Sequence, residues 1–290
     1  MRSLLKITGT QFLHNIRNLR FAISVVLCVI TCMLPTISYY EKSDYKRASV
    51  LSLFFTGGFE KIAENMPEFS SPAIISGFLN ADWFPMLFMA VCAFPAVSLF
   101  ADEYYGGMFY FSLPGSSVNR YSAAKFIAAG LTGASVFVTG FTVYAVLILL
   151  RFPNACEYPP EMLELYPTDV KYFALLALHT TVVAMLCASV MMMLAVFVRD
   201  RYFLFGLPML AVFALNRTWI YIGIRCPQIY DEKNGWWTML DPSCYPNFYS
   251  NFQWYTGFPY GCFLLFALAE LLLFYVIFRK QIERRVRKNA

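Results

Sequence analysis

The chain has few residues with which to carry out catalysis on its own. Only two histidines, His14 and His179, occur among its 290 residues. It contains no Walker A sequence for nucleotide phosphates, no G-x-G-x-x-G, no zinc-binding H-E-x-x-H and no G-x-S-x-G nucleophile motif. We therefore expect no enzyme activity and no cofactor in this chain, so any energy source must be supplied by a separate protein.

Three ionisable residues lie inside apolar segments, namely His179, Arg217 and Glu270. Because an unpaired charge in hydrocarbon costs several kcal/mol, we expect these residues to face the interior of a helix bundle or one another. Arg217 and Glu270 are about 8 Å apart along the membrane normal, so they can pair only if their helices adjoin. Two interpretations stay open: an interhelical ion pair that holds the bundle, and an outer gate that meets the substrate.

The eight cysteines predict no metal site, because no C-x-x-C and no cysteine–histidine spacing suited to zinc occurs. Cys226 and Cys244 share one predicted outer loop, where a disulfide would close a loop of about 18 residues. Such a bond forms only in an oxidising compartment, so both the bonded and the free state stay open. Five others lie in or beside apolar segments and are expected to be small packing residues: Cys28, Cys32, Cys92, Cys187 and Cys262.

The composition indicates that lipid is the solvent of this chain. Hydrophobic residues make up 59% of it and charged residues 14%, whereas a typical soluble domain has about 25% charged residues. So few charges cannot cover a soluble globule of this size, and the basic residues gather at the chain ends rather than in a nucleic-acid-binding pattern. We predict one membrane domain over residues 1–290, with the lipid bilayer as a partner and no nucleic acid.

Six apolar stretches are each long enough to cross about 30 Å of hydrocarbon as a helix. The first is expected to be a permanent anchor rather than a signal peptide, because twenty residues precede it and no small-residue cleavage site follows. The predicted fold is therefore an all-α bundle of six transmembrane helices, at approximately residues 21–40, 83–100, 126–150, 172–198, 202–224 and 259–278.

The lysines and arginines orient this bundle by the positive-inside rule. If both termini lie in the cytoplasm, the inner segments hold 14 basic and four acidic residues; these segments are 1–20, 101–125, 199–201 and 279–290. The outer segments then hold eight basic and 13 acidic residues. The basic C-terminal tail is expected to contact anionic headgroups. We predict a multipass protein of a bacterial cell membrane, with both termini cytoplasmic.

Interfacial helices are predicted at both membrane surfaces. Residues 1–20 place leucine, phenylalanine and isoleucine at helical spacing, which predicts an amphipathic helix on the inner surface. The outer loops 41–82 and 225–258 are too long to be structureless. The first is expected to contain a short helix over 59–65. The second is rich in tryptophan and tyrosine, which predicts re-entrant or interfacial helices between spans five and six.

The inner segment 101–125, ADEYYGGMFYFSLPGSSVNRYSAAK, has the most informative pattern in the chain. Acidic residues end the second span, and the tyrosines and phenylalanines that follow suit a short helix over 104–111 at the inner headgroups. A proline–glycine pair breaks this helix, and Ser116 or Ser117 can cap the next one. We predict a rigid, exposed elbow over 104–118 between spans two and three.

With this segment and this topology, the chain resembles permeases of the ABC-2 type of ATP-binding-cassette exporters. In that family an acidic residue and a glycine end span two and a short coupling helix follows. A proline, a basic residue and the lysine that opens span three come next. The resemblance in topology covers nearly the whole chain. The matching positions are Glu103, Gly106 or Gly107, Pro114, Arg120 and Lys125, with Tyr104 opening the expected coupling helix.

The resemblance implies a permease without an ATPase of its own. Two such bundles, identical or paralogous, would pair with two cytoplasmic P-loop ATPases that bind ATP and magnesium. Closure of the ATPases would push the 104–118 elbow and open a path outward. Two alternatives stay open. One is an intramembrane lipid-modifying enzyme, which needs several catalytic groups at one depth, and the other is a non-transporting assembly or sensory subunit.

Overall fold

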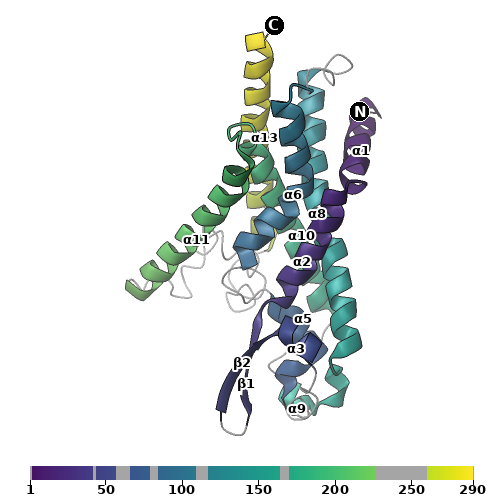
Figure 1. Ribbon diagram of the computed structural model, residues 1–290, viewed down its shortest axis with the longest axis vertical. Helices are drawn as coiled ribbons and strands as arrows, with labels where there is room; N and C mark the ends of the chain where they lie inside the picture. Colours follow the sequence, from purple (N-terminus) through teal and green to yellow (C-terminus); the bar gives the residue numbers. More distant parts are fainter. Residues whose placement is uncertain are drawn as a thin grey trace.

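The computed structural model describes residues 2–41, 44–56, 66–78, 84–108, 117–163, 170–225 and 260–289. Most of these residues are helical, and the longest helices lie roughly along the long axis of the molecule, except α11, which diverges from the others (Figure 1). The long helices are α1 (Arg2–Ile16), α2 (Leu19–Met33), α6 (Phe84–Tyr105), α8 (Val118–Arg151), α10 (Val170–Leu194), α11 (Arg201–Arg225) and α13 (Tyr260–Asn289).

Three helical stretches are long and apolar enough to cross a membrane: Leu87–Tyr105, Val118–Arg151 and Phe173–Leu194. Helices α1 and α2 are bent by 66° relative to each other and would make a fourth span if the pair forms one. The chain is therefore a mostly helical membrane protein. The full number of six spans and the orientation of the bundle stay predictions.

The first predicted span, residues 21–40, ends earlier as a helix than its hydropathy indicates. Helix α2 stops at Met33, and Thr36–Glu41 forms strand β1, which pairs antiparallel with β2 (Asp44–Ser49). Pro35 cannot continue the helix because proline has no N–H for a helical hydrogen bond. The β-branched and aromatic residues that follow it favour a strand. The prediction of a helix through residue 40 is therefore wrong.

The other predicted spans coincide with helices, but some of their ends differ: three helices are longer at one end of the bundle, whereas α10 ends at Leu194 rather than at the predicted residue 198. Helix α6 continues to residue 105 rather than 100, α8 begins at residue 118 rather than 126, and α13 continues through the basic tail to residue 289. Hydropathy cannot locate these ends, because a polar turn of helix and a polar loop have the same composition.

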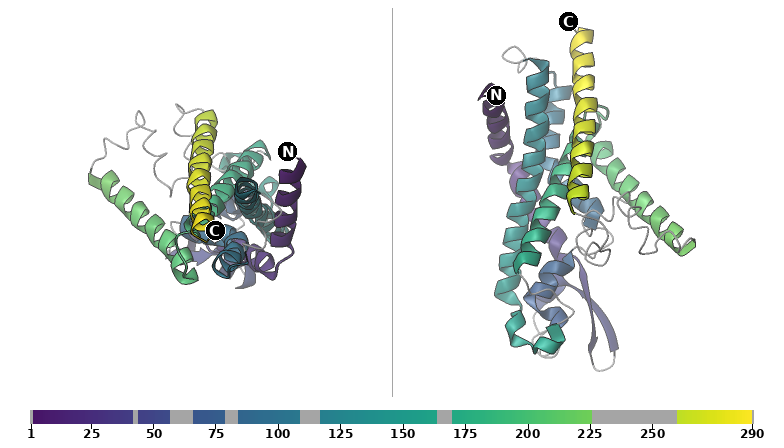
Figure 2. Two further views of the ribbon diagram at one scale, coloured as in Figure 1. Left: turned by 90° about the horizontal axis from the view of Figure 1, so that it is seen from above. Right: turned by 180° about the vertical axis from the view of Figure 1, so that it is seen from behind.

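The two ends of the bundle differ in what they contain. Both chain termini lie at one end, together with the end of α6 and the start of α8, and the β-hairpin lies at the other (Figures 1 and 2). We call these the terminal end and the hairpin end. The described parts of segments 1–20, 101–125 and 279–290, all predicted to be cytoplasmic, therefore share the terminal end.

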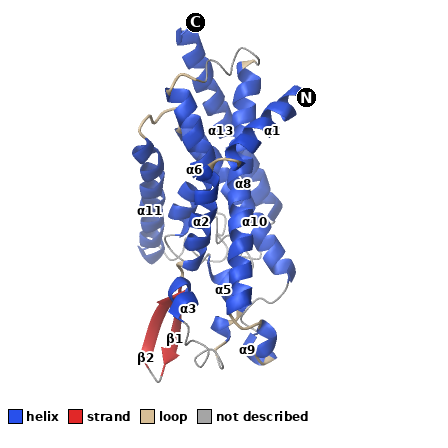
Figure 3. Ribbon diagram, turned by 45° about the vertical axis from the view of Figure 1, so that its right-hand side comes forward, coloured by secondary structure: helices blue, strands red, loops and turns tan. Residues whose placement is uncertain are grey.

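Short elements fold over the bundle at the hairpin end (Figure 3). The backbone N–H and the hydroxyl of Ser71 both donate to the carbonyl of Pro153 at 2.9 Å, and the hydroxyl of Tyr144 on α8 donates to the carbonyl of Ile74 at 2.8 Å. The predicted helix over 59–65 and residues 226–258 of the second predicted outer loop lie outside the described residues, and residue 225 ends α11. The short elements are α3 (Val50–Thr56), α5 (Ser71–Gly77), α9 (Pro160–Leu163) and 3-10 turns at Pro67–Phe69 and Ala155–Glu157.

Glycines on α8 allow the neighbouring helices to approach closely. A Cβ atom added at Gly133 would lie 2.7 Å from the Cβ of Ala188 and 2.8 Å from the carbonyl oxygen of Ala184, both on α10. A Cβ added at Gly140 would lie 2.8 Å from the sulfur of Cys28 on α2. Small residues at helix contacts are typical of membrane bundles, in which close backbone packing drives association.

We expect Gly133→Val to destabilise the folded chain by about 1–3 kcal/mol, because the added atoms have no space between α8 and α10. The measurement is thermal unfolding of the purified protein in detergent, followed by tryptophan fluorescence. Gly206→Val is the matched control, since among the described residues no side chain or neighbouring helix packs within 4 Å of the Cβ position at Gly206 in α11. Equal losses of stability in the two variants would show that helix propensity, rather than close packing, limits substitution at Gly133.

Candidate functional site

Two glycines determine where α6 ends, at the centre of the predicted functional segment. Gly107 has a φ of +76°, a left-handed conformation that glycine adopts without steric cost. The N–H of Gly106 donates to the carbonyl of Asp102 at 2.9 Å, and a Cβ at Gly106 would lie 2.6 Å from that oxygen. Tyr104 belongs to α6, so the prediction that a separate helix begins there is wrong. The rest of that predicted helix, residues 109–111, lies outside the described residues.

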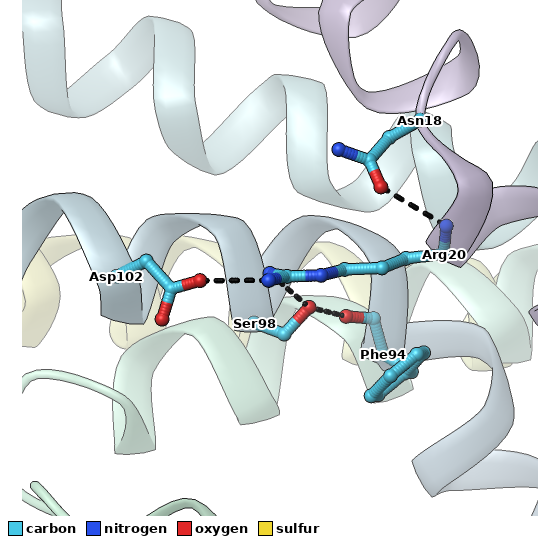
Figure 4. Close-up of polar contacts among 5 residues, drawn as sticks. All are labelled: Asn18, Arg20, Phe94, Ser98 and Asp102. Carbon is cyan, nitrogen blue, oxygen red and sulfur yellow. Dashed lines mark hydrogen bonds and ion pairs between the residues drawn. The ribbon is translucent and has the colours of Figure 1, made fainter.

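Asp102 connects α6 to the start of α2 (Figure 4). Its carboxylate accepts a hydrogen bond from Nη2 of Arg20 at 2.8 Å. The hydroxyl of Ser98 accepts from Nη1 of Arg20 at 3.1 Å and donates to the carbonyl of Phe94. The side-chain oxygen of Asn18 caps α2 by accepting from the backbone N–H of Arg20 at 3.0 Å. The sequence alone does not predict this ion pair, because 82 residues separate its partners. The one local signal is Ser98, four residues before Asp102, because residues at this spacing share one face of a helix.

Glu103 connects α6 to α8 through a more buried ion pair. Nζ of Lys125 lies 2.5 Å from a carboxylate oxygen of Glu103, and the side chains are 7% and 23% exposed, respectively. The ammonium group also lies 5.8 Å from the centre of the Tyr121 ring, one turn earlier on α8. Both partners are predicted site residues, and the structure brings them into contact. A charge as buried as that of Lys125 is tolerated because its partner compensates it.

Tyr104 and Tyr105 connect α6 to two further helices. The guanidinium of Arg285 on α13 lies 3.9 Å from the centre of the Tyr104 ring and 5.4 Å from that of Tyr105. The hydroxyl of Tyr105 donates to the carbonyl of Ala195, the residue that follows α10, at 3.1 Å. The buried ring of Tyr104 stacks on Phe100, with 5.3 Å between the ring centres.

Four consecutive residues at the end of α6 therefore contact three other helices and the residue that follows a fourth. A helix turns by about 100° per residue, so four consecutive side chains point in directions all round its axis. The neighbours are the start of α2, the first turns of α8, the C-terminal part of α13 and the end of α10. We call the four residues, Asp102–Tyr105, the α6 quartet. This end of α6 is therefore in direct contact with all four neighbours.

The remaining residues of the predicted coupling motif lie around the start of α8. The hydroxyl of Ser117 accepts a hydrogen bond from the backbone N–H of Arg120 at 3.4 Å and caps the helix, which confirms one of the two predicted caps. The side chain of Arg120 is exposed at the terminal end. Pro114 lies outside the described residues.

The three ionisable residues predicted inside the membrane lie on three different helices. His179 is completely buried in α10. Arg217 is exposed on α11, and its guanidinium lies 5.3 Å from the centre of the Phe213 ring. Glu270, on α13, is partly buried. The pairing of Arg217 with Glu270 and the alternative of an outer gate both stay predictions.

The described part of the chain brings no metal-binding group together, since no cluster of three or more histidine, cysteine, aspartate or glutamate side chains is found in it. Cys226 and Cys244, the predicted disulfide partners, lie outside the described residues. Four other cysteines are buried with free thiols, as expected of packing residues: Cys28, Cys32, Cys92 and Cys187.

No model of a known protein family matches the chain, and no curated protein is similar to it in sequence.

Proposed function

We propose that this chain is the membrane subunit of an ATP-driven exporter of the ABC-2 type. In this proposal it forms the substrate path and takes its energy from separate cytoplasmic ATPase subunits that bind ATP and magnesium. The helical fold with apolar helices of membrane-crossing length supports a permease. The observation that carries the proposal is the α6 quartet, because a subunit driven from outside needs a place where an external push reaches many helices.

The contacts of the quartet suggest how such a push would spread. The segment that joins α6 to α8 leaves the quartet at Gly106 and Gly107 and returns at Ser117. An ATPase that pressed on this segment would displace the end of α6, and the ion pair of Glu103 with Lys125 would make α8 follow. ATP binding would thereby shift the bundle from one packing to another, because packed helices have a few discrete arrangements rather than a continuous range.

The distribution of charge supports the cytoplasmic side as the place of this contact. The segments predicted to be inside hold 14 of the 23 lysines and arginines. Three of these segments meet at the terminal end through Arg20, Asp102, Tyr104 and Arg285. The positive-inside rule then turns the terminal end, with the α6 quartet, toward the ATP-containing compartment. A second copy of the chain, or a paralogue, would complete the permease.

Purification of the tagged full chain from its native membrane tests this proposal. We expect a protein with a Walker A sequence to be retained in about equal amount, identified by mass spectrometry. The untagged chain, taken through the same steps, is the control. A chain that retains no such ATPase under mild detergent would contradict the proposal and favour the intramembrane enzyme.

The same complex separates a transporter from an assembly or sensory subunit. Compounds that co-purify with the complex are added back one at a time, and ATP hydrolysis is measured. A transporter is expected to hydrolyse ATP faster in the presence of its cargo, because cargo binding favours one of the two packings. Hydrolysis that no co-purified compound changes would favour the non-transporting subunit.

A further inference from the structure

Helix α13 continues well beyond the apolar part of the bundle. The ring of Phe278 lies 5.3 Å from that of Phe100 and 5.9 Å from that of Phe126, measured between ring centres. These three rings form one layer across α6, α8 and α13. A charged residue lies within two positions of the layer on each helix: Asp102 and Arg279 follow their phenylalanines, and Lys125 precedes Phe126. The layer therefore marks the level at which the apolar interior gives way to the terminal end.

Beyond that layer, α13 has one packed face and one cationic face. On the packed face Ile282 is completely buried and Arg285 lies over Tyr104. The opposite face exposes three basic side chains at spacings of four and three residues, which align on one side of a helix. We call Lys280, Arg284 and Arg287 the basic stripe.

The basic stripe has no acidic partner among the residues that the structure describes. Glu283 lies nearest to it in sequence on α13, and its carboxylate accepts a hydrogen bond from Nε of Arg279 at 2.8 Å. Arg279 thus uses this carboxylate, and three positive charges remain exposed on the same side of the helix. Such a surface favours an anionic partner.

The height of the stripe favours a protein over lipid headgroups as that partner. Helix α13 runs along the long axis of the molecule (Figures 1 and 2). At about 1.5 Å per residue, Arg284 lies about 9 Å and Arg287 about 13 Å beyond Phe278. The headgroup layer on each side of a bilayer is only about 5–7 Å thick. Measured at the backbone, Lys280 lies within a headgroup layer of this thickness, as predicted for the basic tail, whereas Arg284 and Arg287 lie farther out than that layer.

We propose that the basic stripe is a second docking surface for the ATPase subunit, which binds it through an acidic face. This inference rests on the proposed function and adds a contact to it. Arg285, on the packed face of the same helix, joins the stripe to Tyr104 of the α6 quartet. The ATPase would therefore hold the end of α6 from two sides, through the α6–α8 segment and through α13.

Charge reversal in the full chain tests the docking surface. The variant Arg284→Glu/Arg287→Glu reverses the outer two charges of the stripe, and Arg284→Gln/Arg287→Gln removes them. The matched control Lys6→Glu/Arg17→Glu reverses two exposed charges on or beside α1, at the same end of the molecule. Each tagged chain is purified from native membranes at low and at high salt. The retained P-loop ATPase and the retained phospholipids are quantified by mass spectrometry, and equal helical content is verified by circular dichroism.

We expect the double glutamate variant to retain about tenfold less ATPase than the unaltered chain at low salt, the double glutamine variant an intermediate amount, and the control the full amount. Unchanged ATPase retention in the glutamate variant would overturn the docking surface while leaving the proposed function intact. Loss of anionic phospholipid without loss of ATPase would identify the stripe as a lipid anchor and overturn it too. If even the unaltered chain retains no P-loop ATPase, the proposed function fails and the docking surface with it.

Discussion

Replacing Glu103 by glutamine is expected to lower the free energy of unfolding by about 3–5 kcal/mol, because the substitution leaves a buried charge without its partner. The ammonium of Lys125 is only 7% exposed and cannot recover its hydration where it lies between α6 and α8. The measurement is denaturant unfolding of the purified chain in detergent. The dependence of the free energy of unfolding on denaturant concentration (the m-value) is compared between variants to detect a change in the unfolded state.

Two further variants show whether the pair itself causes this loss. Asp102→Asn is the matched control, since it makes the same acid-to-amide change one residue earlier. The side chain of Asp102 is 31% exposed. We therefore expect this variant to lower the free energy of unfolding by about 1 kcal/mol or less. Lys125→Met added to Glu103→Gln is expected to recover most of the stability, because no charge then remains buried. Equal losses for the glutamine and asparagine variants would mean that burial does not set the strength of the Glu103 pair.

Replacing Tyr104 by leucine is expected to lower ATP-dependent export at least tenfold while the ATPase subunit remains bound. Leucine preserves an apolar side chain in the interior but removes the aromatic face that Arg285 contacts at 3.9 Å and that stacks on Phe100. The connection between α6 and α13 would be weakened without loss of the fold. Export of a cargo that stimulates ATP hydrolysis is measured in inverted membrane vesicles that contain the complete complex.

Tyr202→Leu is the matched control for this experiment, because it makes the same tyrosine-to-leucine change without removing a buried contact. Tyr202 is 90% exposed at the start of α11. We expect its export to remain within twofold of that of the unaltered chain, a change of about 0.4 kcal/mol. Equal losses of export in both variants, or full export with Tyr104→Leu, would show that the contact of Tyr104 with Arg285 plays no part in coupling ATP hydrolysis to export.

The sequence identifies the long helices because each of them needs a long apolar run, and hydropathy measures this property directly. Hydropathy misidentifies the structure where an apolar stretch has a local preference for a strand rather than a helix. Residues 36–40 are apolar enough to extend the first span, yet Pro35 and the strand-forming residues after it make a hairpin. Pairing of β1 with β2 satisfies the backbone there, which a sum of hydropathies cannot detect.

The candidate site was only half predictable for a similar reason. Glu103 and Lys125 stand out by their types and positions, but the sequence does not say that they touch. Arg20, Asp102 and Arg285 gain their roles from tertiary packing, since they come from segments that are far apart in the chain. A local pattern can find the end of α6, whereas the quartet's four neighbours become visible only once the helices are packed.

We propose that a cytoplasmic ATPase acts on the segment that follows α6, and site-specific photo-cross-linking tests this contact most directly. Benzoylphenylalanine is introduced in place of Met108, which is 65% exposed just after Gly107, or in place of Phe55, which is 77% exposed at the hairpin end. After irradiation of intact cells, the Met108 position is expected to form a covalent product with a P-loop ATPase and the Phe55 position none. A product from Phe55 alone, or no ATPase product from Met108, would contradict the claim.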